Sequence, residues 1–269
     1  VNALDGASFE IGKGRIVGLI GPNGAGKTTA LKAVLGLTPF DGELEVLGKD
    51  PRRERHQIMQ DVCFIADVAT LPKWLKVRQA LGMIENLHPK FDRARAESFL
   101  ANTTVRMDSK VGQLSKGMVT QLHLALLMAI EARLLVLDEP TLGLDIIYRK
   151  DFYTTLLNDY FDQDRTILVT THQVEEIEHI LTDVIFIDRG RIILDSTMES
   201  LADRFVEVAV GPENVDKARS LGPISEREVF GRTIFLFEDG RSGEVAALGD
   251  TRTPGIADLF VAKVKGQAA

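Results

Sequence analysis

Short apolar runs and segments of helical spacing alternate along the first two-thirds of the chain. The runs "GRIVGLI" (14–20), "DVCFIAD" (61–67), "LLVL" (134–137) and "RTILVTT" (165–171) predict buried strands. Apolar residues at helical spacing lie between these runs, most extensively at about 115–131. Because strands alternate with helices, the pattern predicts an α/β fold with a mainly parallel sheet that helices cover.

Weaker patterns predict the remaining elements of this region. Strands are expected at "SFEI" (8–11), "DGELEVLG" (41–48), "VIFIDRG" and "RIILD", and helices at 146–161 and 173–181. The stretch from about 70 to 113 is polar and helix-like, which predicts a helical insertion into the sheet domain. The charged run "KDPRRERH" (49–56) predicts a solvated loop rather than a nucleic-acid contact.

The pattern changes after about Arg204. "FVEVAV", "SEREVFG" and "RTIFLFE" predict strands, "ENVDKARSL" and "GEVAALG" predict helices, and "IADLFVAKV" predicts a closing helix. We therefore expect two parts, a larger domain at 1–203 and a small α+β accessory region at 204–269.

The composition is that of an ordinary globular protein, with 45% hydrophobic and 26% charged residues among 269. The net charge of −7 argues against nucleic acid as the main partner. The one cysteine, Cys63, excludes an internal disulfide and is expected to be a small core residue. No segment approaches the roughly 20 apolar residues that span a bilayer, and no signal peptide is predicted.

A glycine-rich loop follows the first buried strand. "GPNGAGKTT" matches the pattern G-x-x-x-x-G-K-[ST], with a strand before it and a helix after it. The glycines let backbone N–H groups approach phosphate oxygens, Lys27 would reach the β- and γ-phosphates, and Thr28 would ligate Mg²⁺. The candidate ATP-binding residues are Gly21, Pro22, Asn23, Gly24, Ala25, Gly26, Lys27, Thr28 and Thr29.

Two adjacent acids end the "LLVL" strand. In P-loop enzymes an acid at this place holds Mg²⁺, usually through water, and Asp138 suits that role. Glu139 is placed to polarise the attacking water as a general base. The alternative, that both acids are helix-capping or surface groups, fits poorly with an apolar strand that runs directly into them.

With these motifs, residues 1–203 resemble the nucleotide-binding subunits of ABC transporters. "LSKGM" stands where that family has its LSGGQ-type signature, "TLGLD" corresponds to the D-loop with Asp145, and "TTHQVEE" supplies the switch histidine, His172. The signature positions are Leu114, Ser115, Lys116, Gly117 and Met118.

The resemblance implies a P-loop NTPase fold with an antiparallel β subdomain and a helical subdomain at about 70–132. It also implies a homodimer in which each of two Mg-ATP molecules lies between one subunit's phosphate loop and the other's signature. Ser115 and the Gly117 backbone would then hold the γ-phosphate of the partner's ATP. His172 would contact the γ-phosphate of its own subunit's ATP and support Glu139.

Two of the motifs depart from the family pattern. The signature has Lys116 and Met118 where the family has glycine and glutamine, and activity is expected to survive this change. Asp67 occupies the position of the Q-loop glutamine, where it is either a Mg²⁺ ligand or a turn residue.

The resemblance also implies a partner and a location. ATP hydrolysis would drive a separate transmembrane permease from the cytoplasmic face of the cell membrane. Trp74 with Leu71, Leu75 and Val77 would form an apolar docking patch for it, unless Trp74 is a core residue.

The ending "TRTPGIADLFVAKVKG" favours an exporter over an importer. The alternative is a regulatory or importer subunit with slow hydrolysis. A DNA-repair relative is excluded because only 87 residues separate Lys27 from Ser115. The accessory region would serve dimer contacts, regulation or stability.

Overall fold

The main body of the protein is a six-stranded sheet in the order β2-β3-β4-β1-β5-β6. The computed structural model describes residues 3–66, 71–142, 144–238 and 242–266. Four neighbouring pairs are parallel, and only β5 and β6 are antiparallel. The strands are β1 (Ile16–Ile20), β2 (Val62–Ala66), β3 (Leu134–Asp138), β4 (Thr166–Thr171), β5 (Asp183–Asp188) and β6 (Arg191–Thr197). The predicted fold class, α/β with a mainly parallel sheet, is confirmed.

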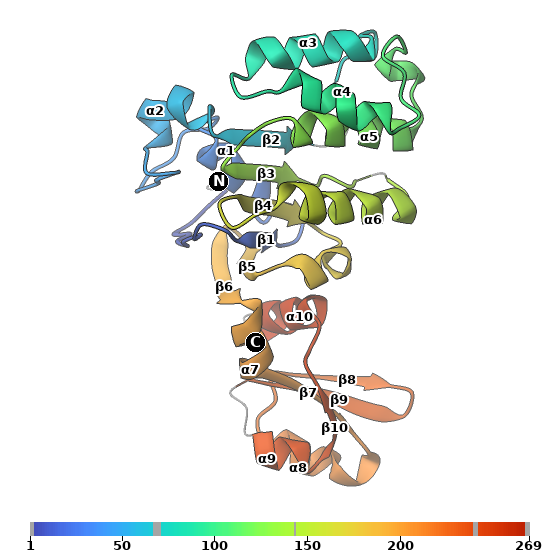
Figure 1. The fold of residues 1–269 in the computed structure, drawn as a ribbon. Coiled ribbons are helices and arrows are strands. Elements are labelled where there is room, and N and C mark those ends of the chain that lie inside the picture. The colour runs from blue at the N-terminus through green and yellow to red at the C-terminus, as the bar shows by residue number, and fades with distance from the viewer. Residues whose placement is uncertain (1–2, 67–70, 143, 239–241, 267–269) are drawn as a thin grey trace.

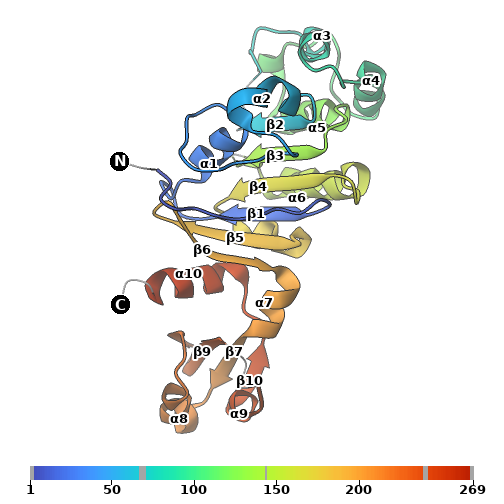
Figure 2. The ribbon, with the colours of Figure 1, turned by 90° about the vertical axis from the view of Figure 1, so that its left-hand side faces the viewer.

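Helices cover both faces of this sheet, because alternate residues of each buried strand point to opposite sides. On one face, Val136 and Leu168 pack with Leu31 of helix α1 (Lys27–Val34). On the other face, Leu137 and Val169 join a core that includes residues of α5, α6 and α10. Helices α5 (Lys116–Met128), α6 (Ile146–Thr155) and α10 (Ile256–Gly266) thus lie opposite α1, as Figures 1 and 2 show.

The predicted helical insertion is present at the β2 edge of the molecule (Figure 1). It consists of α3 (Val77–Leu87), α4 (Arg93–Ala101), the 3₁₀ turn η1 (Val111–Gln113) and the start of α5. These elements share a separate core around Leu81, Leu100 and Leu122, each of which is almost fully buried.

Four segments differ from their predictions. Residues 8–11 form no strand, and 41–48 hold only the single bridge between Val46 and Lys49, because Leu47 and Gly48 both have left-handed backbones and reverse the chain. The charged run is not a loop but a helix, α2 (Pro51–Ile58), which Asp50 caps. The predicted helix at 173–181 consists of two 3₁₀ turns, η3 (Val174–Glu176) and η4 (Glu178–Ile180).

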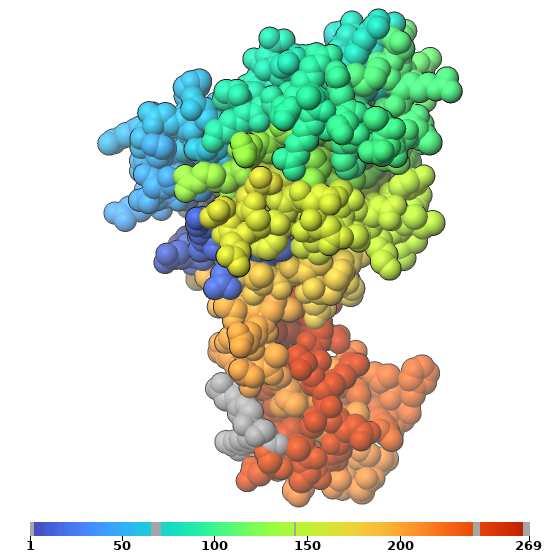
Figure 3. Space-filling view, in the orientation of Figure 1, coloured from blue at the N-terminus to red at the C-terminus, as the bar shows by residue number. Residues whose placement is uncertain are grey.

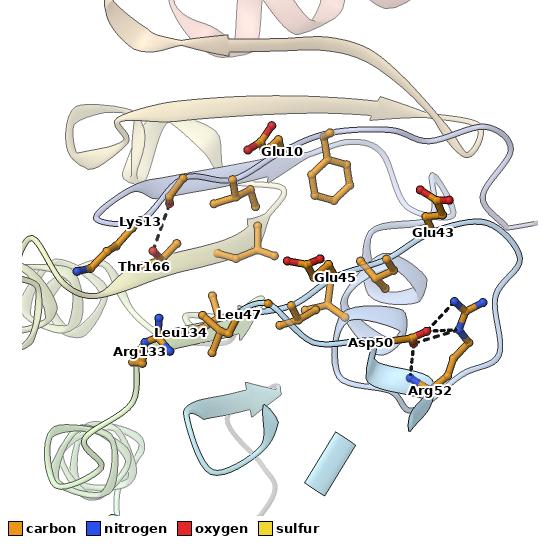
Figure 4. Close-up of a pocket in the computed structure, with 18 of the residues that line it drawn as sticks. Glu10, Lys13, Glu43, Glu45, Leu47, Asp50, Arg52, Arg133, Leu134 and Thr166 are labelled. Atoms are coloured by element: carbon orange, nitrogen blue, oxygen red, sulfur yellow. Dashed lines mark hydrogen bonds and ion pairs between the residues drawn. The ribbon is translucent and has the colours of Figure 1, made fainter. Parts of the chain in front are cut away.

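The segments at 8–11 and 41–48 border a cavity on the larger domain. It measures about 780 Å³ and lies between residues 9–13, residues 43–52 and the amino ends of β3 and β4. Figure 4 shows Glu10, Glu43 and Glu45 on its walls, with Asp50 already paired to Arg52. This cavity lies at the end of the parallel strands opposite the phosphate loop, so it is not part of the site described below.

The chain after Thr197 forms a second, antiparallel sheet in the order β10-β7-β9-β8. Its elements are α7 (Met198–Arg204), β7 (Phe205–Val210), η5 (Pro212–Asn214), α8 (Val215–Ser220), β8 (Ser225–Val229), β9 (Arg232–Glu238), α9 (Ser242–Ala246) and β10 (Gly249–Arg252). Helix α10 then returns and lies between the two sheets (Figures 1 and 2). A narrow waist separates the two parts in the space-filling view (Figure 3).

Candidate functional site

The phosphate loop wraps around a cavity of about 400 Å³ at the carboxyl ends of the parallel strands. All of the loop except Gly21 and Ala25 lines this cavity, together with Asp138 and Glu139. Gly26 begins helix α1 with φ 110°, and a side chain there would come within 2.6 Å of the Ala3 carbonyl oxygen. Only glycine fits this conformation and this space. The loop therefore exposes backbone amides and the start of a helix to an anion.

The amine of Lys27 lies inside the loop. Its Nζ donates to the carbonyl oxygen of Gly21 at 2.6 Å and to that of Pro22 at 3.3 Å, and the residue is only 7% exposed. Burial lowers the pKa of Lys27, and the negative charges of Glu139 and Asp138 oppose this shift. The site thus keeps a cation facing two carboxylates, with the cavity between them.

Asp138 and Thr28 bring two oxygen ligands together. Thr28 Oγ1 lies 3.5 Å from Asp138 Oδ1, which is at the outer limit of hydrogen bonding. The hydroxyl of Thr170, the residue opposite Asp138 on β4, donates to the same oxygen at 2.6 Å and orients it. Mg²⁺ is usually bound by one or two such oxygens together with water and substrate phosphates, so this pair fits Mg²⁺. In the described part of the chain no group of three or more His, Cys, Asp or Glu forms another metal site.

Glu139 points toward His172. Its backbone is left-handed, with φ 49°, which is unusual for a residue with a side chain. His172 Nδ1 lies 2.8 Å from Glu139 Oε2, and the His172 backbone N–H donates to the same oxygen at 3.4 Å. A carboxylate oxygen accepts hydrogen bonds, so the Nδ1–H tautomer of His172 can donate to Glu139. The structure thus brings together two residues that lie 33 positions apart in the sequence.

The signature residues lie away from this cavity. Ser115 caps helix α5 by accepting the Met118 N–H, which leaves its own hydroxyl hydrogen available to donate. Lys116 is exposed in the first turn and Leu114 precedes it, but neither lines the cavity. Gly117 is buried against Tyr148, and a Cβ there would lie 2.1 Å from the Tyr148 ring. The glycine is therefore needed for packing inside this chain.

Asp145 caps helix α6, where its carboxylate accepts the N–H groups of Ile147 and Tyr148. Asp67 lies outside the described residues. Sequence reasoning missed Thr170, although it precedes His172 by two positions, because its contact with Asp138 depends on the pairing of β3 with β4. It also missed Ala3, which lines the cavity, and Arg149, which is described below.

Residues 4–142 match the family model described as ABC transporter. The chain therefore belongs to the ABC transporter family, as one of its ATP-binding subunits. A solved structure of an ATP-binding subunit of an ABC transporter is 25% identical, with a TM-score of 0.66 over 74% of this chain and 85% of that chain.

Similar proteins in this family include ATP-binding proteins that are named for export or for drug resistance. The Nod factor export ATP-binding protein I of Burkholderia pseudomallei is 36% identical over 248 residues, which cover 88% of this chain and 81% of that protein. The daunorubicin resistance ATP-binding protein DrrA3 of Streptomyces coeruleorubidus is 33% identical over 205 residues, which cover 74% of this chain and 65% of that protein. The chain is thus an ABC ATP-binding subunit whose ATPase activity is coupled to transport. None of the helices in its described residues has the length and apolarity needed to cross a bilayer.

Proposed function

We propose that two copies of this chain pack head to tail around two Mg-ATP molecules and drive export by a separate membrane permease. One observation carries the proposal. The phosphate loop, Asp138 and Glu139 line the cavity, but none of residues 114–118 does. Ser115 instead caps a 13-residue helix, and its hydroxyl hydrogen is available to donate to another group. A second copy would bring its own helix N-terminus to the open side of the cavity.

Each residue of the site then has a role. Lys27 and the loop amides hold the phosphates, and Thr28 with Asp138 would hold Mg²⁺, which supplies positive charge to the phosphate oxygens. Glu139 accepts a proton from the water that attacks the γ-phosphorus, and the electron pair of the broken P–O bond leaves with ADP. His172 fixes the orientation of Glu139 through the 2.8 Å contact.

The permease would dock on the helical insertion, from the cytoplasmic face of the cell membrane. Trp74 is 71% exposed, which supports a contact role rather than a core role. Leu71, Leu75 and Val77 are buried in the core of the insertion, so the expected four-residue patch is wrong. Of these four residues, Trp74 alone remains as a proposed apolar contact for the permease.

The dimer is tested by size-exclusion chromatography of Glu139→Gln with Mg-ATP. The variant should bind ATP without hydrolysing it and should elute as a dimer only when both ATP and Mg²⁺ are present. Glu175→Gln is the matched control, because Glu175 is exposed on the neighbouring turn, and it should hydrolyse ATP like the unchanged protein. A Glu139→Gln variant that binds ATP and stays monomeric at every concentration would contradict the head-to-tail arrangement.

A further inference from the structure

Arg149 connects the two loops that carry Glu139 and His172. It lies on α6, four residues after Asp145, and its side chain is 19% exposed. Its Nε donates to the Leu144 carbonyl oxygen at 2.7 Å. Its Nη1 donates to Glu176 Oε1 at 2.5 Å and also contacts Gln173 Oε1. One guanidinium therefore bonds to the end of the D-loop and to the turn that follows His172.

Both bonded segments are continuous with the catalytic pair. On one side, the Leu144 N–H donates to the Thr141 carbonyl oxygen at 3.1 Å, and Thr141 lies two residues after Glu139 with only 3% exposure. On the other side, Gln173 is the neighbour of His172, and its N–H donates to Thr171 Oγ1 at 3.0 Å. A shift of either segment would therefore change the separation of Glu139 and His172.

We propose that Arg149 is a positioning residue for ATP hydrolysis, which holds the D-loop at a fixed distance from the turn after His172. Arginine suits this role because its rigid planar group donates to several acceptors at once, whereas a lysine ammonium is a flexible point charge. The inference rests on the proposed roles of Glu139 and His172.

A purely structural role for Arg149 predicts a different experimental result. Glu176 Oε2 is buried without a hydrogen-bond partner in the described part of the chain, so Arg149 supplies the positive charge beside this carboxylate. Removing Arg149 leaves a mostly buried negative charge, which destabilises a fold strongly. If charge compensation were the whole role, making Glu176 neutral at the same time would restore both stability and turnover.

The experiment measures steady-state ATP hydrolysis and thermal unfolding of Arg149→Met, Arg149→Lys and the double variant Arg149→Met/Glu176→Gln. We expect Arg149→Met to lower kcat about tenfold or more, with KM for ATP changed by less than about threefold. Arg149→Lys should recover part of kcat. The double variant should regain the melting temperature of the unchanged protein, while its kcat stays low. Recovery of both quantities in the double variant would overturn the inference.

Two further variants separate a specific effect of Arg149 from general destabilisation and from failure of the proposed function. Arg165→Met is the matched control, because Arg165 is 15% exposed and donates to the Tyr160 carbonyl oxygen at 2.8 Å, but lies before β4, away from the cavity. It should lower stability without lowering kcat. Glu139→Gln separates the two proposals: full activity in that variant would overturn the proposed function. If that variant is inactive but Arg149→Met keeps the kcat of the unchanged protein, only the role of Arg149 is wrong.

Discussion

Adjacent carboxylates at the end of β3 serve different partners because the backbone turns between them. Asp138 is still in the strand, in register with Thr170, and accepts its hydroxyl. Glu139 has the left-handed φ of 49°, which ends the strand and leaves its carboxylate beside His172. Strained backbone of this kind costs about 1–3 kcal/mol and is concentrated at functional sites. The two acids are thus directed to different neighbours, Thr170 and His172, which is consistent with the separate metal and water roles proposed for them.

Residue-level features outside the site also affect stability. His123 on α5 is 7% exposed, and burial lowers its pKa to about 4. An unfolded chain binds this proton near pH 6.5, so the stability that comes from neutral His123 is present above that pH and is lost as the pH falls toward 4. The loss amounts to about 3.5 kcal/mol at most, from about 1.4 kcal/mol per unit over the pKa difference between 6.5 and about 4.

His123→Gln should therefore reduce the pH dependence of the unfolding free energy between pH 7.5 and 4.5, as measured by urea denaturation. Part of the dependence should remain, because burial also lowers the pKa of His88. Equal pH dependence in the variant and in the unchanged protein would show that the folded state does not exclude the His123 proton.

The site residues that share a sequence motif could be predicted, whereas those that meet through folding could not. The phosphate loop, Asp138, Glu139 and His172 stand at recognisable spacings after buried strands. Thr170 and Arg149 have no such signal, because their partners lie 32 and 27 positions away and the contacts arise from strand pairing and helix packing.

At the scale of elements, α10 is part of the larger core rather than an appendage. Ile256 and Leu259 are 1% exposed in the same cluster as Leu137 and Val169. The Ile256 N–H donates to Glu178 Oε1 at 3.0 Å, so the 3₁₀ turn η4 caps this helix. Phe260 meets Phe186 edge to face at 5.1 Å. This packing favours stabilisation among the three expected roles of the accessory region.

Phe260→Ala should lower the free energy of unfolding by about 2–4 kcal/mol, because it removes a ring packed on the sheet. Val261→Ala is the matched control on the next position of the same helix, since Val261 is 49% exposed, and it should change stability little. Thermal unfolding of the two variants measures the difference. Equal melting temperatures would show that α10 does not contribute to the core.

Elements with strong apolar patterns were predicted well, and polar elements were not. β10 has four exposed residues, "GDTR", and pairs with β7 at the edge of the second sheet, so no alternation of apolar residues marks it. Helix α2 was hidden in the charged run, where the capping Asp50 and Pro51 were the available signal. The strand expected at 41–48 is absent because the left-handed backbones of Leu47 and Gly48 reverse the chain there.

At the scale of the whole molecule, the phosphate-loop cavity and the signature residues of one chain lie apart. The phosphate loop, the metal ligands and Glu139 line the cavity, while residues 114–118 of the same chain do not. The central claim of the account is that the missing part is supplied by the signature of a second copy. A two-fold pair built this way contains two equivalent composite sites.

The most direct measurement mixes two variants that are each inactive alone, Lys27→Ala and Ser115→Arg, and follows ATP hydrolysis against total protein concentration. In a head-to-tail pair, the Ser115→Arg copy supplies an intact phosphate loop and the Lys27→Ala copy supplies an intact signature. Half of random pairs are mixed and each has one intact site of two, so the mixture should regain up to about a quarter of the activity of the unchanged protein. A mixture that is no more active than either variant alone, beside an active unchanged protein, would contradict the shared site.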